Sequence, residues 1–246
     1  MRNTPSAFGA TLVATALLLA GVTAIAAQGS PTMEHLVFNI DGHGNMPYAV
    51  SVPDGYDPDG EPRPLVLALH PGGITGAYYG SRNLRGIFEP GLRGLGAVMV
   101  APDVPTRRWN SDVANRGVMA LLQQVVDTYN IDRSRILVTG FSLGGAGTWF
   151  FAGQHPDFFT GAIPIAGRAS DLDPEAFGDM PIHIIHSRAD EVVPFEPAEA
   201  AFDQLEAAGH PVAFTPLEGV GHFNMGSYVP SLQAAGDWMV ARWDGR

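Results

Sequence analysis

One segment constrains the fold of this chain more than any other, the run RILVTGFSLGGAG at residues 135–147. An apolar, β-branched stretch leads into Gly-x-Ser-x-Gly, and a run of small residues follows. This context predicts a sharp turn from a buried strand into a helix, with Ser142 presented at the turn. Gly140 and Gly144 remove side chains where the two elements meet, and the free N–H groups of the helix start point at the serine. Ser142 is therefore the candidate nucleophile, and the alternative is a glycine-rich turn with a bystander serine.

Two later loops supply candidate partners, in the chain order serine, acid, histidine that this motif requires. The run PIHIIHSRADEVVP predicts a buried strand and then a loop that carries Asp190, with Glu191 as the rival acid. The run VAFTPL predicts the next strand, and His222 follows it in a second loop. Asp190 is expected to orient His222 and to stabilise its protonated form, while His222 acts as the base toward Ser142. Gly221 is expected to let the second loop turn tightly.

An earlier apolar run, LVLALHPGG, predicts a buried strand that ends in a glycine turn. A tetrahedral oxyanion needs two preorganised N–H donors. One is expected from Leu143, the residue after the nucleophile, and the other from Gly72 or Gly73. The alternative for these two glycines is a plain turn after a buried strand. His70 is expected to hydrogen-bond the loop backbone and to do no chemistry.

Aromatic residues on predicted loops are the candidates for the walls of a substrate cleft. Trp109 is the main one, because it lies in the polar run TRRWN and is expected to be exposed. His70, at the end of its strand, is the second candidate for substrate contact. The other candidates are more often core residues: Tyr78, Tyr79, Phe141, Phe195 and Phe223.

The remaining histidines give little support for a metal site. His183 and His186 are three residues apart, and in a strand this odd offset sends side chains to opposite faces, so we expect them to pack in the core or at the strand end. The chain has no cysteine and no His-Glu-x-x-His run, so we expect no metal and no cofactor. The run DGYDPDG lacks the closing acid of a calcium loop and is expected to be a polar turn.

The order of periodic segments predicts an α/β fold, with a mostly parallel central sheet and helices on both faces. The expected strands are 36–40, 48–52, 65–69, 97–101, 136–139, 162–166, 182–186 and 212–216, and the main expected helices are 113–129, 144–154, 197–208 and 232–243. The first two strands are expected to form a hairpin. Only about fifty residues separate Ser142 from Asp190, so we expect no large lid.

These motifs together resemble those of the α/β-hydrolases, in the secreted esterase branch with carboxylesterase/phospholipase-like, feruloyl-esterase-like and polyhydroxyalkanoate-depolymerase-like members. The residues that carry the resemblance are 69–73, 140–145, 187–194 and 221–222, with further similarity at 101–105, 109 and 147–149, so it extends over essentially the whole mature chain. One departure affects the oxyanion site. The family usually has His-Gly where this chain has His70-Pro71, and proline has no N–H to donate, which places more reliance on Gly72 and Gly73.

The N-terminus and the charge balance suggest where the chain acts. Residues 1–27 hold one arginine, a long apolar stretch and a small-x-small end, which predicts a cleaved signal peptide, with an uncleaved membrane anchor as the alternative. The remaining 28–246 is expected to be one catalytic domain, secreted or periplasmic. The 25 acidic against 14 basic residues argue against nucleic acid as a partner and against stable membrane association after cleavage.

The resemblance implies acyl transfer from a small-molecule or polymeric ester to water through Ser142, His222 and Asp190. The ester is expected to be of a short-chain, aryl, carbohydrate or polyester type, and these possibilities stay open. A serine peptidase or amidase with the same three residues is one alternative. A catalytically silent binding protein on the same scaffold is another, although the intact set of motif residues argues against it.

Overall fold

The computed structural model describes Met1, residues 32–73 and residues 76–245. The expected signal peptide at 1–27 lies, apart from Met1, outside these residues. Among the described residues, no helix combines the length and the apolar character that crossing a membrane requires.

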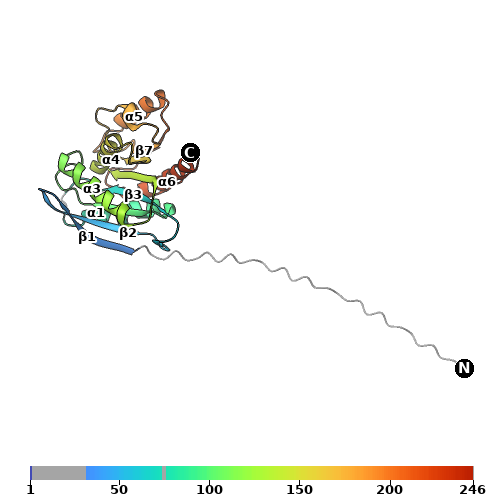
Figure 1. The fold of residues 1–246 in the computed structure, drawn as a ribbon. Coiled ribbons are helices and arrows are strands. Elements are labelled where there is room, and N and C mark those ends of the chain that lie inside the picture. Colours follow the sequence, from blue (N-terminus) through green and yellow to red (C-terminus); the bar gives the residue numbers. More distant parts are fainter. Residues whose placement is uncertain (2–31, 74–75, 246) are drawn as a thin grey trace.

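Eight strands of the described residues form one sheet, in the order β1-β2-β4-β3-β5-β6-β7-β8 (Figure 1). The strands are β1 (Thr32–Ile40), β2 (Gly44–Val52), β3 (Arg63–Leu69), β4 (Val98–Pro102), β5 (Ile131–Phe141), β6 (Gly161–Ile165), β7 (Ile182–Ser187) and β8 (Val212–Leu217). Only the β1–β2 and β2–β4 pairs are antiparallel, and every later pair is parallel. The predicted mostly parallel sheet is therefore confirmed, and the predicted hairpin forms with longer strands than expected.

Helices cover both faces of this sheet, as the alternation of segments predicts. They are α1 (Tyr79–Asn83), α2 (Glu89–Leu92), α3 (Asp112–Thr128), α4 (Leu143–Gln154), α5 (Glu196–Ala207) and α6 (Val229–Asp244), with shorter turns η1 (Leu84–Phe88), η2 (Arg93–Leu95), η3 (Pro174–Phe177) and η4 (Met225–Tyr228). One buried cluster joins the sheet to α3, α4 and α5, and a second joins it to η1, α2 and α6.

The helical run from α1 to η2 was not expected from the sequence. It is built of short pieces, including a π-helical turn at η1, and Pro90 and Gly91 interrupt its helical propensity. Its apolar residues nevertheless repeat at helical spacing, since Leu84, Phe88 and Leu92 are all buried against α6 and the sheet. That spacing was the signal that could have revealed it.

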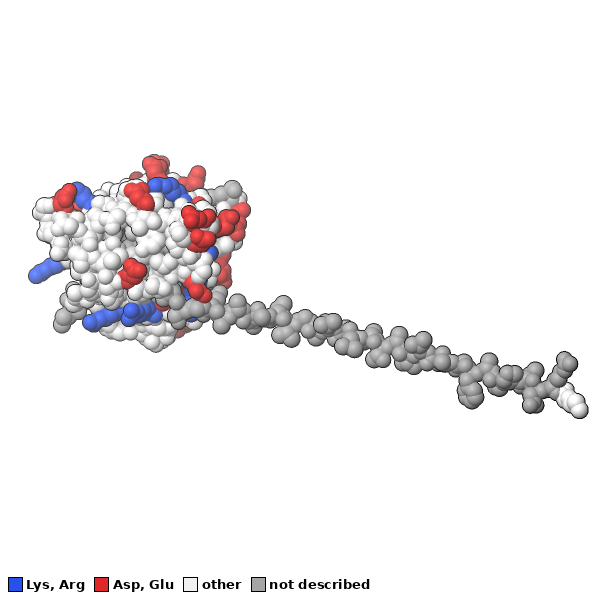
Figure 2. Space-filling view, turned by 60° about the horizontal axis from the view of Figure 1, so that its bottom comes forward, with Lys and Arg blue, Asp and Glu red and all other residues white. Residues whose placement is uncertain are grey.

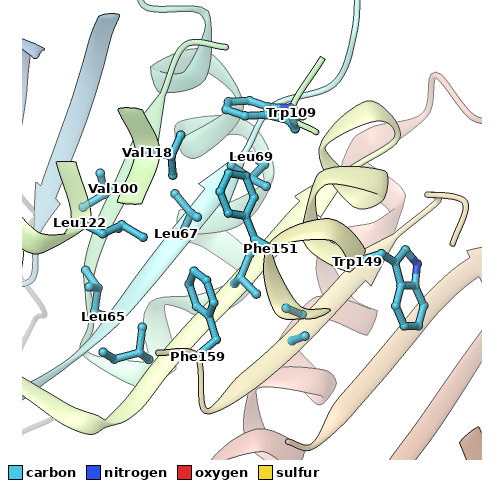
Figure 3. Close-up of a cluster of buried hydrophobic side chains, with 14 of the residues drawn as sticks. Leu65, Leu67, Leu69, Val100, Trp109, Val118, Leu122, Trp149, Phe151 and Phe159 are labelled. Carbon is cyan, nitrogen blue, oxygen red and sulfur yellow. The ribbon is translucent and has the colours of Figure 1, made fainter. Parts of the chain in front are cut away.

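The core explains why the central strands are apolar without alternation. Along β3, Leu65, Leu67 and Leu69 enter the cluster with α3 and α4, as Figure 3 shows, whereas Val66 and Ala68 enter the opposite cluster. Both faces of the strand are therefore shielded from water, which favours a continuous apolar run. Because β3, β5, β7 and β8 run parallel, their carboxyl ends lie at one edge of the sheet, where their loops meet.

Three smaller features agree with the sequence. Between Ser142 and Asp190 the chain contains α4, β6, η3 and β7, with no inserted lid domain. The chain carries 25 acidic against 14 basic residues, and Figure 2 shows Asp and Glu side chains gathered at the top and right of a mostly uncharged face. The segment at 54–60 forms a turn in which the N–H of Asp59 donates to the carboxylate of Asp57.

Candidate active site

Ser142 stands at the turn between β5 and α4, in a backbone conformation that few side chains adopt. Its φ of 56° and ψ of −114° lie outside the usual regions, at a cost of about 1–3 kcal/mol. Two backbone hydrogen bonds hold the turn: the N–H of Ser142 donates to Ile165 O at 2.9 Å, and the N–H of Ala146 donates to Ser142 O at 2.9 Å. The strand–turn–helix context expected for the motif is therefore present.

Close backbone packing places this turn against the end of β3. A Cβ built on Gly144 would overlap the carbonyl oxygen of Leu69 and lie 2.9 Å from that of His70. Only glycine allows α4 to begin at this distance from the strand. The serine and the glycine turn after β3 are neighbours for this reason.

The three residues expected to act together lie in hydrogen-bond contact. Ser142 Oγ is 2.8 Å from His222 Nε2, and His222 Nδ1 is 2.7 Å from Asp190 Oδ2. A carboxylate can only accept, so Nδ1 carries the proton and Nε2 is the acceptor that faces the serine hydroxyl. His222 is 4% exposed, which shields the arrangement from bulk water. The geometry is that of a serine activated by an oriented imidazole.

The loop after β7 shapes the surroundings of Asp190. Its Oδ1 accepts hydrogen bonds from the N–H groups of Val192 and Val193, at 2.9 and 2.8 Å. The carboxylate is fully buried, and these donors offset the loss of its hydration. Asp190 is thus held on the loop while Oδ2 stays available to His222.

Glu191, the rival acid, has a different position. Its Oε2 accepts the backbone N–H of His222 at 2.9 Å and makes no contact with the imidazole nitrogens. The tight turn expected at Gly221 is present, because the N–H of Asn224 donates to Gly221 O at 3.1 Å, while the positive φ of this loop, 68°, belongs to Gly219. Gly221 also leaves room for the acid, since a Cβ there would lie 3.1 Å from Glu191 Oε2.

The two expected sources of an oxyanion site face each other. Leu143 is the first residue of α4, so its N–H has no acceptor within the helix. A Cβ built on Gly72 would lie 3.6 Å from Leu143 Cδ2, which places the turn after β3 beside the helix start. Gly73 has φ of 131°, a conformation that favours glycine. Both glycines stay candidates for the second donor.

The buried side chains of His70 and Trp109 support the glycine turn after β3. His70 accepts the N–H of Val104 at Nε2 and donates from Nδ1 to Pro71 O, at 2.9 and 2.7 Å, and burial lowers its pKa. Trp109 donates its indole N–H to His70 O at 3.1 Å. Each is 1% exposed, so the expectation of an exposed Trp109 was wrong. The backbone role expected of His70 is confirmed, whereas its burial argues against the substrate contact expected of it.

Asp103 holds the backbone near the site, a role that was not expected from the sequence. Its carboxylate accepts the N–H groups of Tyr78 and Gly80, at 2.6 and 2.8 Å, and so ties the chain after the glycine turn to the end of β4. An acid directly after a buried strand, at the edge where the other site residues lie, was the signal available.

A pocket of about 420 Å³ lies beside the nucleophile, along one face of α4. It begins at Leu143 and continues past Ala146 and Phe150, with the segments 108–110 and 168–177 as the other walls. Trp109 contributes to a wall despite its burial, whereas Ser142 and His222 do not line the pocket.

The other aromatic candidates divide into core and surface residues. Phe141 and Phe195 are buried, and Tyr78 and Tyr79 are partly buried. Phe223 is 80% exposed, with its ring centroid 5.5 Å from that of His222. Phe223 therefore flanks the site on the histidine side, away from the α4 pocket.

The comparisons with known proteins agree with this site. The family model described as phospholipase/carboxylesterase matches residues 107–235, slightly more than half of the chain. The chain belongs to the phospholipase/carboxylesterase family. This family membership confirms the α/β-hydrolase resemblance.

Individual relatives agree with this family match. Feruloyl esterase C of Emericella nidulans is 30% identical over 175 residues, which cover 68% of this chain and 62% of that protein. The crystal structure of a thermostable esterase has a TM-score of 0.72 at 29% identity, over 85% of this chain and 62% of the other. Est1E from Butyrivibrio proteoclasticus shares the fold, with a TM-score of 0.66 at 16% identity over 84% of this chain and 99% of its own. The chain thus matches less than two thirds of the first two proteins.

Proposed function

We propose that this protein is a serine esterase that hydrolyses carboxylic esters through Ser142, His222 and Asp190. The observation that carries the proposal is the continuous hydrogen-bonded chain from Ser142 Oγ through His222 to Asp190, with distances of 2.8 and 2.7 Å. It lies at the carboxyl edge of the sheet, where folds of this class bind ligands.

Ser142, His222 and Asp190 act together in the acylation step. His222 Nε2 accepts the hydroxyl proton as Ser142 Oγ attacks the ester carbonyl carbon, and Asp190 stabilises the imidazolium that forms. The carbonyl oxygen becomes an oxyanion, which accepts hydrogen bonds from the N–H of Leu143 and that of Gly72 or Gly73. Each such donor contributes about 10²–10³ in rate in related mechanisms.

Collapse of the intermediate releases the alcohol. His222 gives its proton to the departing alkoxy oxygen, the C–O bond breaks and an acyl-enzyme remains on Ser142. A water molecule then gives a proton to His222 and attacks the acyl carbon. Return of that proton to Ser142 Oγ frees the carboxylic acid and regenerates the enzyme.

We infer the orientation of the substrate from the two sides of the serine, and its chemical class with support from the relatives. Because His222 protonates the leaving alcohol, the alcohol lies on the side of His222 and Phe223. The acyl group then extends past Leu143 into the α4 pocket, whose walls include Trp149, Phe150 and Phe177. An aromatic wall of this kind, together with the feruloyl esterase relative, favours an aryl or other compact acyl group.

The cellular site is part of the same proposal. We place the catalytic domain at 28–246, secreted or periplasmic after removal of 1–27. N-terminal sequencing of the exported protein tests this, since a start near residue 28 supports cleavage and an intact Met1 in the membrane fraction contradicts it.

Hydrolysis of a panel of p-nitrophenyl esters, from acetate to palmitate and including ferulate, tests the activity. The wild type is expected to cleave short and aryl esters, and Ser142→Ala is expected to lose about 10⁴-fold or more in kcat. Labelling by a fluorophosphonate probe should require Ser142. Substantial esterase activity in Ser142→Ala, or a preference for amides over esters, would contradict the proposal.

Ala146→Phe tests where the acyl group lies. The larger side chain fills the α4 pocket and should raise KM for ferulate and longer acyl esters, while acetate is cleaved at the wild-type rate. An equal effect of Ala146→Phe on all esters would contradict the placement of the acyl group in the α4 pocket.

A further inference from the structure

His186 is a buried titratable residue beside the site that the mechanism above does not use. It is the penultimate residue of β7, 1% exposed, with the ring of Phe195 edge-on at 5.9 Å. Its Nε2 lies 3.0 Å from Val193 O and 3.5 Å from Asp190 Oδ2. Its Nδ1 is buried and has no hydrogen-bond partner among the described residues.

These contacts determine the tautomer of the ring. A carbonyl oxygen can only accept, so Nε2 carries the proton and donates to Val193 O, while Nδ1 is unprotonated. Burial lowers the pKa of His186, which keeps the ring neutral. One polarised N–H is therefore directed at the loop that carries Asp190, with the carboxylate just beyond hydrogen-bond distance.

The loop at 190–193 can support Asp190 only while it keeps its present shape. The N–H groups of Val192 and Val193 reach Oδ1 only while residues 190–193 keep their turn. The carbonyl of Val193, in the same turn, is the group that His186 holds from the strand. A bond from β7 to this carbonyl thus supports the position of the acid that orients His222.

We propose that His186 is a positioning residue for the triad, which holds the 190–193 turn through Val193 O so that Asp190 stays aligned on His222. The inference rests on the proposed esterase function. It assigns no proton transfer to His186, because its one N–H is donated to a carbonyl.

The charged groups around His186 come from several elements. Asp190 faces it from its own loop, Glu196 from the start of α5, and His222 from the loop after β8. Arg188 lies over the ring of Phe195 at 4.2 Å, and the hydroxyl of Tyr228 lies near Asp190. Substitution of neutral His186 by another neutral residue therefore leaves the net charge of the site unchanged.

His183 provides a matched control on the same strand. It is 6% exposed, also has a buried Nδ1 without a partner among the described residues, and bonds Thr215 Oγ1 from Nε2 at 2.8 Å. Its ring packs edge-on against Trp238 of α6, on the opposite face of the sheet from α5. A role in packing alone should make the two histidines equivalent.

The test compares His186→Leu with His183→Leu in p-nitrophenyl acetate hydrolysis, in the rate of fluorophosphonate labelling and in thermal stability. His186→Leu is expected to lower kcat and the labelling rate about tenfold, the factor for one hydrogen bond, with KM within about twofold. The acidic limb of its kcat/KM profile should move to lower pH, because a loosened Asp190 stabilises protonated His222 less. His183→Leu should change only the melting temperature.

If His186→Leu does not fold, a second pair of variants tests the same inference. In His186→Gln the amide N–H can reach Val193 O, whereas in His186→Asn it is too short. Gln should restore kcat to within about threefold of the wild type and Asn should not. Wild-type kcat and pH profile in His186→Leu, or equal kcat in Gln and Asn, would overturn the inference.

The outcomes for the inference and for the proposed function are separable. If the wild type cleaves no ester, the esterase proposal fails, and the labelling rates of the His186 variants still report the alignment of the triad. If the wild type cleaves esters and the His186 variants match it, only the inference fails.

Discussion

The two halves of the site are positioned by different forces. Ser142 is held by main-chain packing, because α4 begins against the end of β3 with room for no side chain at Gly144. Asp190 and His222 are held by hydrogen bonds from loops, with Val192, Val193 and Glu191 as partners. The nucleophile is thus placed by steric fit of the main chain, with two main-chain hydrogen bonds at its turn, and its partners by polar contacts that involve side chains.

This difference predicts which substitutions the serine half and the acid–histidine half of the site each tolerate. Steric fit does not depend on pH, and it fails when a single methyl group is added. Polar contacts accept modest changes in volume but depend on the charge and tautomer of each group. Substitutions that change only volume or only charge therefore separate the two halves.

Gly144→Ala should have the largest effect on stability, because the added methyl overlaps the carbonyl oxygen of Leu69. We expect a loss of about 3 kcal/mol or more in the free energy of unfolding, and a melting temperature lower by about 10 °C. Gly86→Ala is the control, since nothing lies within 4 Å of its built Cβ. Calorimetry that finds Gly144→Ala within about 2 °C of the wild type would refute steric positioning.

Asp190→Asn should abolish most activity with little loss of fold. The amide keeps the shape of the carboxylate but favours the wrong tautomer of His222, so kcat should fall about 10⁴-fold. Steady-state kinetics and circular dichroism together measure this, with the exposed Asp203→Asn as the control. A fall of less than tenfold would mean that Glu191 replaces Asp190.

Acid should destabilise the protein through histidines that are buried without charge. Burial lowers the pKa of His183 from 6.5 to about 4, so the unfolded chain binds its proton first as pH falls. Stability should fall from about pH 6.5 down to about pH 4, by up to about 3 kcal/mol from this group. Melting curves of the wild type and His183→Leu over this range test it, and equal slopes would contradict the assignment.

Glu191→Ala should have the smallest effect. It removes the acceptor of the His222 N–H, but the side chain is exposed and water can replace it. We expect kcat/KM to fall about fivefold with no change in melting temperature. Glu206→Ala, on the exposed face of α5, serves as the control. A fall as large as that of Asp190→Asn would show that the two acids share one role.

Local patterns revealed most of the fold and the members of the site. The apolar runs predict the strands to within a few residues because each is bounded by turn residues, although β1, β2 and β5 are longer than expected. The motif around Ser142 and the chain order of Asp190 and His222 predict which residues meet, since parallel strands end at one edge. The helices from α1 to η2 were missed because Pro90 and Gly91 divide them into short pieces.

The sequence by itself determined the fold class and selected the three candidate site residues, because both follow from spacing along one strand, turn or helix. Only the tertiary structure decided which neighbours support them. Three features depend on how whole elements pack: the burial of Trp109, the hydrogen bond that the His222 N–H donates to Glu191, and the approach of His186 to Val193. Contacts of this kind leave no periodic signal in the chain, so their partners could be named only after the sheet and its loops were in place.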